Sequence, residues 1–170
     1  MADNELKCVS FYELDQKVFA GLKDKQNEIK NWYGKASGIA DYVASWGMVR
    51  FWAMSRSQVA KGGKDKENNE EAQSYFAWKV AREVLCEIVG NDLGIELEEG
   101  ENLKDIETAR FHKIFYALNF NKQVLLIDLL IEISETIQFW SVRMKEVYDL
   151  NEKLKAQGNN VSSSSDLEKV

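Results

Sequence analysis

Apolar residues recur along this chain at the three- and four-residue spacing of amphipathic helices, and no segment shows the sustained alternation of a strand. The pattern predicts an all-α protein, folded as a single five-helix bundle whose last helix is the longest. The expected helices cover residues 10–34, 37–60, 70–89, 103–118 and 122–156. The chain contains no proline, so no helix is interrupted by a proline residue.

Local signals mark several of the expected helix ends. Ser10-Phe11-Tyr12-Glu13 has the spacing of a capping box, in which a hydroxyl and a carboxylate bind free backbone N–H groups. Gly34 suits a left-handed C-terminal stop, and Asn121 suits the N-terminal cap of the last helix. Gly47 lies inside the second expected helix, where glycine costs about 1 kcal/mol relative to alanine. We therefore expect either a kink at Gly47 or the close approach of another backbone.

The second expected helix is apolar around much of its circumference, which indicates burial by the core on one side and by a partner on another. The expected protein-interface residues are Trp46, Trp52 and Met54.

The chain ends and the most apolar run indicate a cytoplasmic protein. Residues 1–5 are acidic and lack the apolar region of a signal peptide. The apolar run 124–133 is too short for a bilayer, which needs about 20 residues. We expect residues 1–157 to form the helical domain and the Ser-rich residues 158–170 to form a flexible tail.

The distribution of charge changes the meaning of the net charge of −6. Residues 91–107 contain seven acidic residues and one lysine, so this segment carries the whole net charge and is expected to face solvent or a basic neighbouring protein. Residues 30–66 contain seven basic and two acidic residues, interleaved with aromatic ones that include Trp32, Tyr33, Trp46 and Trp52. A basic, aromatic stretch of this kind suits a nucleic-acid backbone and its bases. The same aromatics also fit helical core spacing, so both interpretations stay open.

Catalytic chemistry has little support in this sequence. His112 is the single histidine, and Cys8 and Cys86 fit no metal-binding or redox spacing, which indicates two reduced thiols. Asp128 and Glu132 share a helix face, as a carboxylate metal pair would, but lack the Glu-x-x-His companion of di-iron bundles. We expect no enzyme activity, no cofactor and no metal; a carboxylate-metal bundle enzyme is the weakest of the alternatives.

A short apolar motif adds a family resemblance. In the stretch Ile39-Ala40-Asp41-Tyr42-Val43-Ala44-Ser45-Trp46-Gly47-Met48, followed by Ala53-Met54-Ser55-Arg56-Ser57, four small residues fall in a compatible register: Ser45, Gly47, Ala53 and Ser57. This stretch resembles the small-subunit family of type III-B CRISPR RNA-targeting (Cmr) complexes. The element order is also similar, with Gln16, Tyr75, Trp78 and Trp140 in compatible helices. The chain departs from the family at Ala40, where proline is common, and at Trp46, where asparagine is common.

The resemblance implies a non-catalytic subunit of an antiviral ribonucleoprotein complex. Its partners would be other subunits, copies of itself stacked along the complex, and guide and target RNA, with no membrane and no small-molecule substrate. RNA would be held by its backbone, and cleavage would belong to other subunits. The basic residues implied as RNA contacts are Arg50, Arg56, Lys61, Lys64, Arg143 and Lys145. The alternative is a helical scaffold or adaptor that binds only protein through the Trp-rich second helix.

Overall fold

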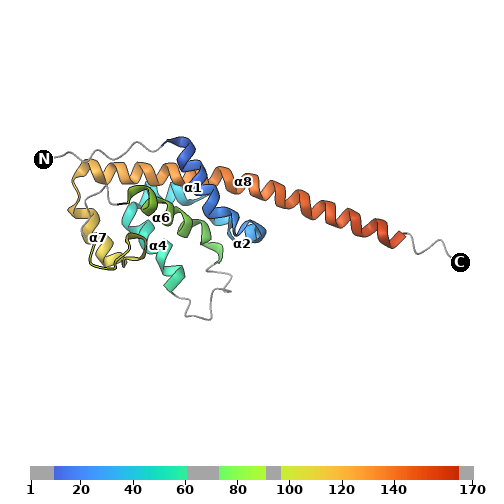
Figure 1. Ribbon diagram of the computed structural model, residues 1–170, viewed down its shortest axis with the longest axis horizontal. Coiled ribbons are helices and arrows are strands. Elements are labelled where there is room, and N and C mark those ends of the chain that lie inside the picture. The colour runs from blue at the N-terminus through green and yellow to red at the C-terminus, as the bar shows by residue number, and fades with distance from the viewer. Residues whose placement is uncertain (1–9, 61–72, 91–96, 165–170) are drawn as a thin grey trace.

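A computed structural model describes residues 10–60, 73–90 and 97–164, and every regular element in these ranges is helical (Figure 1). The α-helices are α1 (Phe11–Lys23), α2 (Ile29–Ala36), α3 (Ile39–Trp46), α4 (Met48–Ala60), α6 (Phe76–Val89), α7 (Thr108–Ala117) and α8 (Phe120–Ser164). Short 3-10 turns occupy Gln26–Glu28 and Leu103–Asp105. The all-α prediction is confirmed, whereas the predicted count of five is wrong because the first two expected helices are each divided.

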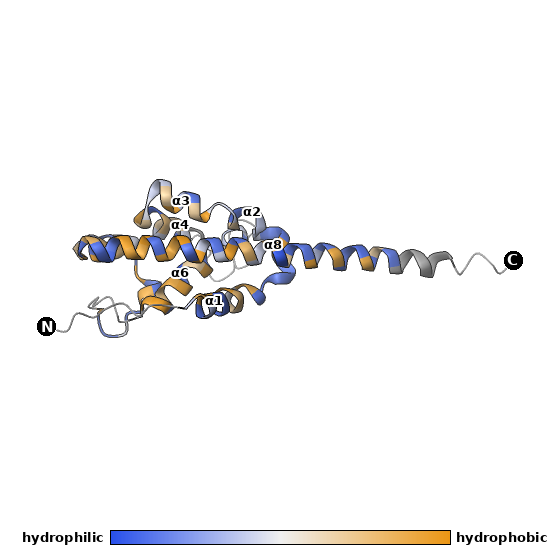
Figure 2. Ribbon diagram, turned by 90° about the horizontal axis from the view of Figure 1, so that it is seen from above, coloured by the Kyte–Doolittle hydropathy of each residue, from blue (hydrophilic) through white to orange (hydrophobic). Residues whose placement is uncertain are grey.

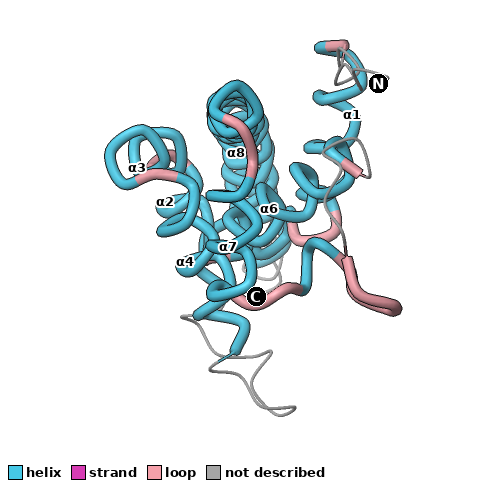
Figure 3. Tube along the Cα trace, turned by 90° about the vertical axis from the view of Figure 1, so that its left-hand side faces the viewer, coloured by secondary structure: helices cyan, strands magenta, loops and turns pink. Residues whose placement is uncertain are grey.

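Helix α8 is the centre of the bundle. It contacts α1, α2, α3 and α6, and in Figures 2 and 3 α2 and α3 lie on one side of it and α1 on the other. Its buried stripe comprises Leu126, Leu130, Ile133, Ile137 and Met144. The remaining core is filled by large side chains of the shorter helices, among them Leu22, Ile29, Trp32, Ile39, Phe51 and Trp52. The C-terminal part of α8 extends beyond the other helices (Figure 1).

The first expected helix begins as predicted but ends early. The Ser10 hydroxyl accepts a hydrogen bond from the Glu13 N–H at 3.2 Å, which confirms the N-terminal cap. Helix α1 then ends at Lys23, and the chain turns before α2. In this turn the Lys25 carbonyl accepts from the Glu28 N–H at 3.0 Å and also from the Trp32 indole N–H at 3.0 Å, so the indole ties the turn to α2. Gly34 lies within α2 and does not end a helix, contrary to expectation.

Gly47 separates α3 from α4. Its φ of +79° is in the region that favours glycine, its N–H donates to the Val43 carbonyl at 2.8 Å, and its own carbonyl accepts from the Phe51 N–H. Among the described atoms, none would lie within 4 Å of a Cβ added there, apart from the chain neighbours and the local helix backbone. The expected kink is therefore a full break, and the alternative of a closely approaching backbone is wrong.

Helix α8 is longer than expected at both ends. Asn119, rather than Asn121, supplies the cap, because its side-chain oxygen accepts from the Lys122 N–H at 2.9 Å. The helix runs to Ser164, so the predicted tail boundary at residue 158 is wrong for residues 158–164, while residues 165–170 lie outside the described ranges. The 45 residues correspond to about 68 Å at 1.5 Å per residue. Within the described part of the chain, none of the helices has the length and apolar character needed to cross a membrane.

Candidate interaction site

Trp46 and Arg50 meet on the surface at the junction of α3 and α4. Because Gly47 breaks the helix between them, the last residue of α3 and the first turn of α4 form an elbow. The Arg50 guanidinium carbon lies 4.8 Å from the centre of the Trp46 ring, a cation–π distance. The Trp46 side chain is 56% exposed and Arg50 is also exposed. We call this pair the Trp46–Arg50 elbow; it presents an aromatic face and a cation together to solvent.

Trp52 belongs to the core and not to a surface. It is 0% exposed, its ring stacks on Phe111 with centroids 3.8 Å apart, and its indole N–H donates to the Ile106 carbonyl at 3.2 Å. Met54 is half-buried against the core, and Trp32 is buried as well. Of the three expected protein-interface residues, Trp46 is therefore the one with a largely exposed side chain, and the core interpretation of Trp32 and Trp52 is confirmed.

Arg56 is used inside the chain. Its guanidinium donates to the Asp105 carbonyl oxygen, which ties α4 to the 3-10 turn at Leu103–Asp105. The side chain is half-buried, so a bound phosphate would compete with this internal contact. Lys61 and Lys64, the other two candidates near α4, lie outside the described residues.

Arg143 and Lys145 lie on α8, and both have partners of their own. Arg143 is exposed; it pairs with Glu146 at 2.9 Å, and its guanidinium lies 5.5 Å from the Phe139 ring centre. Lys145 is half-buried and pairs with Asp149 at 2.5 Å. Of the predicted RNA contacts that the structure describes, Arg50 thus lies in the elbow, Arg56 binds the 3-10 turn at Leu103–Asp105, and the other two lie on α8.

A second cationic and aromatic cluster links α2 to α8. The Lys30 ammonium lies 4.9 Å from the centre of the Tyr148 ring, and the Lys145 ammonium lies 6.0 Å from that of Tyr33. We call these four residues the lysine–tyrosine patch. Sequence reasoning singled out Lys145 alone as a site residue, because nothing in the sequence places Tyr148 next to Lys30.

A buried arginine joins α6 to α4. Arg82 is 4% exposed, and its guanidinium donates to the Ser55 carbonyl at 2.8 Å and to the Ser55 hydroxyl at 3.2 Å. Burial is the main cause that lowers the pKa of Arg82, and the charge of Arg56 adds to it. No sequence signal distinguished Arg82 from a surface residue of α6. Its contacts are internal, so it ties α6 to α4 at Ser55 and is not exposed to a ligand.

The acidic segment is partly neutralised by the chain itself. Within its described part, Glu101 accepts a hydrogen bond from the Arg110 guanidinium at 2.8 Å, and the two groups form an ion pair at 2.7 Å; Glu98 lies 3.4 Å from the same guanidinium. The Glu98 backbone N–H also donates to Glu101 at 2.9 Å. These bonds, the backbone one first and Arg110 second, lower the pKa of Glu101. The segment therefore packs against α7 as well as facing solvent, which the charge pattern alone did not indicate.

The residues considered for catalysis lie on two helices, His112 on α7 and Asp128 and Glu132 on α8. His112 is exposed beside Tyr116, while Asp128 is exposed and Glu132 is half-buried. The described residues contain no group of three or more His, Cys, Asp or Glu side chains that could hold a metal ion. Cys86 is a buried free thiol, and burial raises its pKa to about 12, so it remains protonated.

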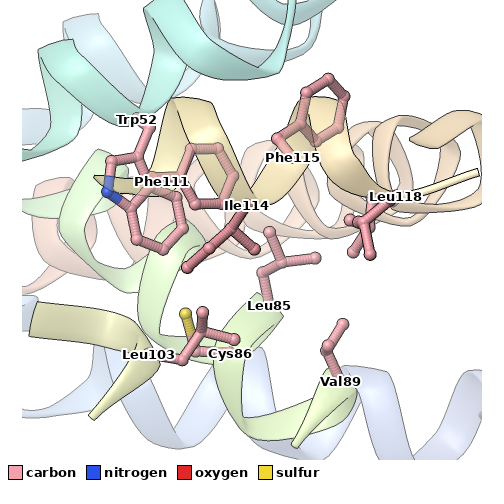
Figure 4. A pocket seen from close by; sticks show the side chains of 10 residues that line it. Trp52, Leu85, Cys86, Val89, Leu103, Phe111, Ile114, Phe115 and Leu118 are labelled. Atoms are coloured by element: carbon pink, nitrogen blue, oxygen red, sulfur yellow. The ribbon is translucent and has the colours of Figure 1, made fainter. Parts of the chain in front are cut away.

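The apolar pocket between α4, α6 and α7 is almost closed by its own lining. Figure 4 shows Trp52, Phe111, Ile114 and Leu85 converging on it, with Cys86 at one side. Its volume is about 10 Å³, close to the minimum for a single water, and its lining is apolar. This pocket has no room for a substrate.

Comparison with known protein families, with curated proteins and with solved structures finds no match to this chain. The exposed elbow is therefore the feature of this chain that points most directly to a function.

Proposed function

We propose that this chain is a non-catalytic small subunit of a type III CRISPR RNA-guided effector complex, in which the Trp46–Arg50 elbow contacts RNA. Two observations support the proposal. The stretch 39–57 resembles the small-subunit family, and within that stretch the structure exposes a tryptophan and an arginine side by side. The exposed pair is the observation that carries the proposal.

The chemistry of the elbow suits the backbone and the exposed bases of RNA. A guanidinium offers paired N–H donors to phosphate oxygens. An indole face stacks on any base, a contact of about 1–3 kcal/mol in single-strand binding proteins. Neither contact reads base edges, so binding would be sensitive to salt and insensitive to sequence.

Secondary contacts would come from α8 and from the lysine–tyrosine patch. Arg143 is exposed and can exchange its Glu146 partner for a phosphate, since exposed ion pairs are weak. Lys61 and Lys64 follow α4 in the sequence and remain candidates. Arg56 is the least suitable of the six, because its guanidinium already binds the Asp105 carbonyl.

Binding to a single-stranded RNA at low and moderate salt tests the proposal. We expect Arg50→Glu and Trp46→Ala to weaken binding several-fold each, and Arg50→Glu to reduce the salt dependence by about one counterion. Lys23→Glu is the matched control, because Lys23 is exposed on α1, on the other side of α8 from α3 (Figure 2). Equal binding by Arg50→Glu and the control, or no binding at low salt by the chain and by its native complex, would refute RNA contact at the elbow.

A protein-only scaffold is the second candidate, and the exposure of Trp46 favours it. Tryptophan and arginine are the side chains most enriched at the energetic centres of protein interfaces. A scaffold predicts that Trp46→Ala releases a co-purifying protein while the native assembly contains no nucleic acid. A high ratio of absorbance at nucleic-acid to protein wavelengths in that assembly would contradict it.

A further inference from the structure

An apolar stripe continues along α8 after the bundle has ended. Val147, Leu150 and Leu154 are 58%, 57% and 57% exposed, and their spacing of three and four residues places them on one helix face. Tyr148 still reaches back to α2 through Lys30. We call residues 149–164 the arm; in Figures 1 and 2 it extends away from the other helices.

A helix of this kind is marginal when it stands alone in water. The arm has 16 residues, little more than the about 12–15 below which isolated helices are marginal even in alanine-rich sequences. It also contains one glycine, three asparagines and three serines, which form helices less readily than alanine does. Its ion pair between Lys155 and Glu152 at 3.1 Å is exposed and contributes little. Burial of the apolar stripe against a partner is the interaction that would hold the arm helical.

We infer that the arm pairs with the same arm of a second copy of this chain, in antiparallel orientation. Charge favours a second copy over a strongly acidic or basic partner. The arm contains two acidic residues, Asp149 and Glu152, and two basic ones, Lys153 and Lys155, so it is neutral overall. Two copies can therefore approach without net repulsion, and the shared apolar stripe is the surface they have in common.

The positions of the leucines and the length of the arm favour an antiparallel pair centred on residue 152. Leu150 and Leu154 are each two residues from that centre. Leu150 of one copy therefore lies opposite Leu154 of the other. The arm ends at Ser164, which falls opposite residue 140 of the second copy. There the surface has a hollow of about 170 Å³ between α1 and α8, lined by Phe19, Trp140, Val147 and Asn151 among others.

Antiparallel pairing also keeps the two bundles apart. Helices surround the first part of α8 on both sides (Figures 2 and 3), so a parallel pair would bring two bundles together at the base of the arms. Antiparallel arms place them at opposite ends. The inference does not rest on the proposed RNA contacts, because none of the six basic candidates lies in the arm.

The mass of the intact chain in solution tests the pairing. We expect a concentration-dependent dimer by sedimentation and light scattering, and a monomer for Leu150→Asp/Leu154→Asp. Leu125→Asp is the matched control, since Leu125 is a leucine of the same helix, 44% exposed, near its other end. The control should dimerise as the unmodified chain does. A monomeric unmodified chain at high concentration would overturn the inference, and so would a dimer that survives the double substitution.

Spin labels at Gln138 test the orientation. In an antiparallel pair centred on residue 152 the two labels are separated by 28 residues of helix, about 42 Å, whereas parallel helices would place them roughly 10 Å apart. Gln138 is exposed, and labelling in a Cys8→Ser background leaves only the buried Cys86, whose raised pKa makes it unreactive. The short distance would overturn the antiparallel pair.

Discussion

The Arg82 guanidinium donates to the Ser55 carbonyl oxygen at 2.8 Å, inside the core between α6 and α4. Among the residues that the structure describes, no carboxylate forms an ion pair with Arg82, and its Nε has no hydrogen-bond partner. The charge is therefore held by carbonyl and hydroxyl oxygens and by the nearby Trp52 ring, 6.0 Å away.

This arrangement predicts losses of stability of different size for two substitutions of Arg82. Arg82→Ala should lower the free energy of unfolding by about 2–4 kcal/mol, because it leaves a cavity in the core in addition to removing the bonds to Ser55. Arg82→Met fills the space without burying a charge and should cost about 1 kcal/mol or less. Urea denaturation measures both; equal losses would show that the guanidinium bonds, and not the volume, dominate.

Gly21 predicts a steric coupling between α1 and α6. A Cβ at Gly21 would lie 2.7 Å from the Val80 Cγ1, and Val80 is buried. Gly21→Ala should therefore destabilise the protein by about 1–3 kcal/mol, despite the better helix propensity of alanine. Val80→Ala alone should also destabilise it by leaving a cavity. The double variant should lose clearly less than the sum of the two, whereas additive losses would contradict a direct clash.

Substitution by alanine should have opposite effects on stability at Gly47 and at Gly34. Gly47 has φ +79° and ψ 172°, a conformation almost restricted to glycine, so Gly47→Ala should cost about 1–3 kcal/mol. Gly34 lies within α2 with nothing within 4 Å of an added Cβ, so Gly34→Ala should stabilise the protein by about 0.4–1 kcal/mol. Thermal unfolding of both variants checks the signs. Only Gly47→Ala should also disturb the fluorescence of the exposed Trp46.

Glu101 predicts an acid-sensitive contact between the acidic segment and α7. Its pKa is lowered from 4.5 by the Glu98 N–H and by Arg110, so the carboxylate stabilises the fold above about pH 4.5. That contribution is lost as the pH falls through the lower folded-state pKa. The difference in stability between the unmodified chain and Glu101→Gln should be present at neutral pH and vanish in acid. A difference that does not change with pH would exclude the carboxylate as its source.

The helical pattern of the sequence was sufficient for the fold class but not for the helix ends. The Ser10 cap follows from local chemistry and is confirmed. The break after Lys23 is accompanied by a 3-10 turn and by the Trp32 indole bond to the Lys25 carbonyl, and the spacing of apolar residues indicates neither. Gly34 and Gly47 are the same residue type in similar apolar patterns, and only Gly47 adopts a positive φ.

The helical pattern of the sequence was also insufficient to predict the candidate site. Trp46 and Trp52 both lie at helical spacing in one apolar stretch, yet one is exposed and the other is stacked on Phe111, 59 positions further along the chain. The orientation of each indole is decided by the break at Gly47 and by the packing of α7. The lysine–tyrosine patch joins Lys30 to Tyr148, and no periodicity relates such distant positions.

One uninterrupted helix carries both the core stripe of the bundle and the arm, from Phe120 to Ser164. Such a helix is a spacer of fixed length, in which each residue adds 1.5 Å and turns the following side chains by 100°. Anything bound to the arm is thereby held at a set distance and rotation from the bundle. Removing seven residues from the arm would shorten that distance by about 10.5 Å and keep the binding face nearly aligned, whereas removing five would turn the face to the opposite side of the helix.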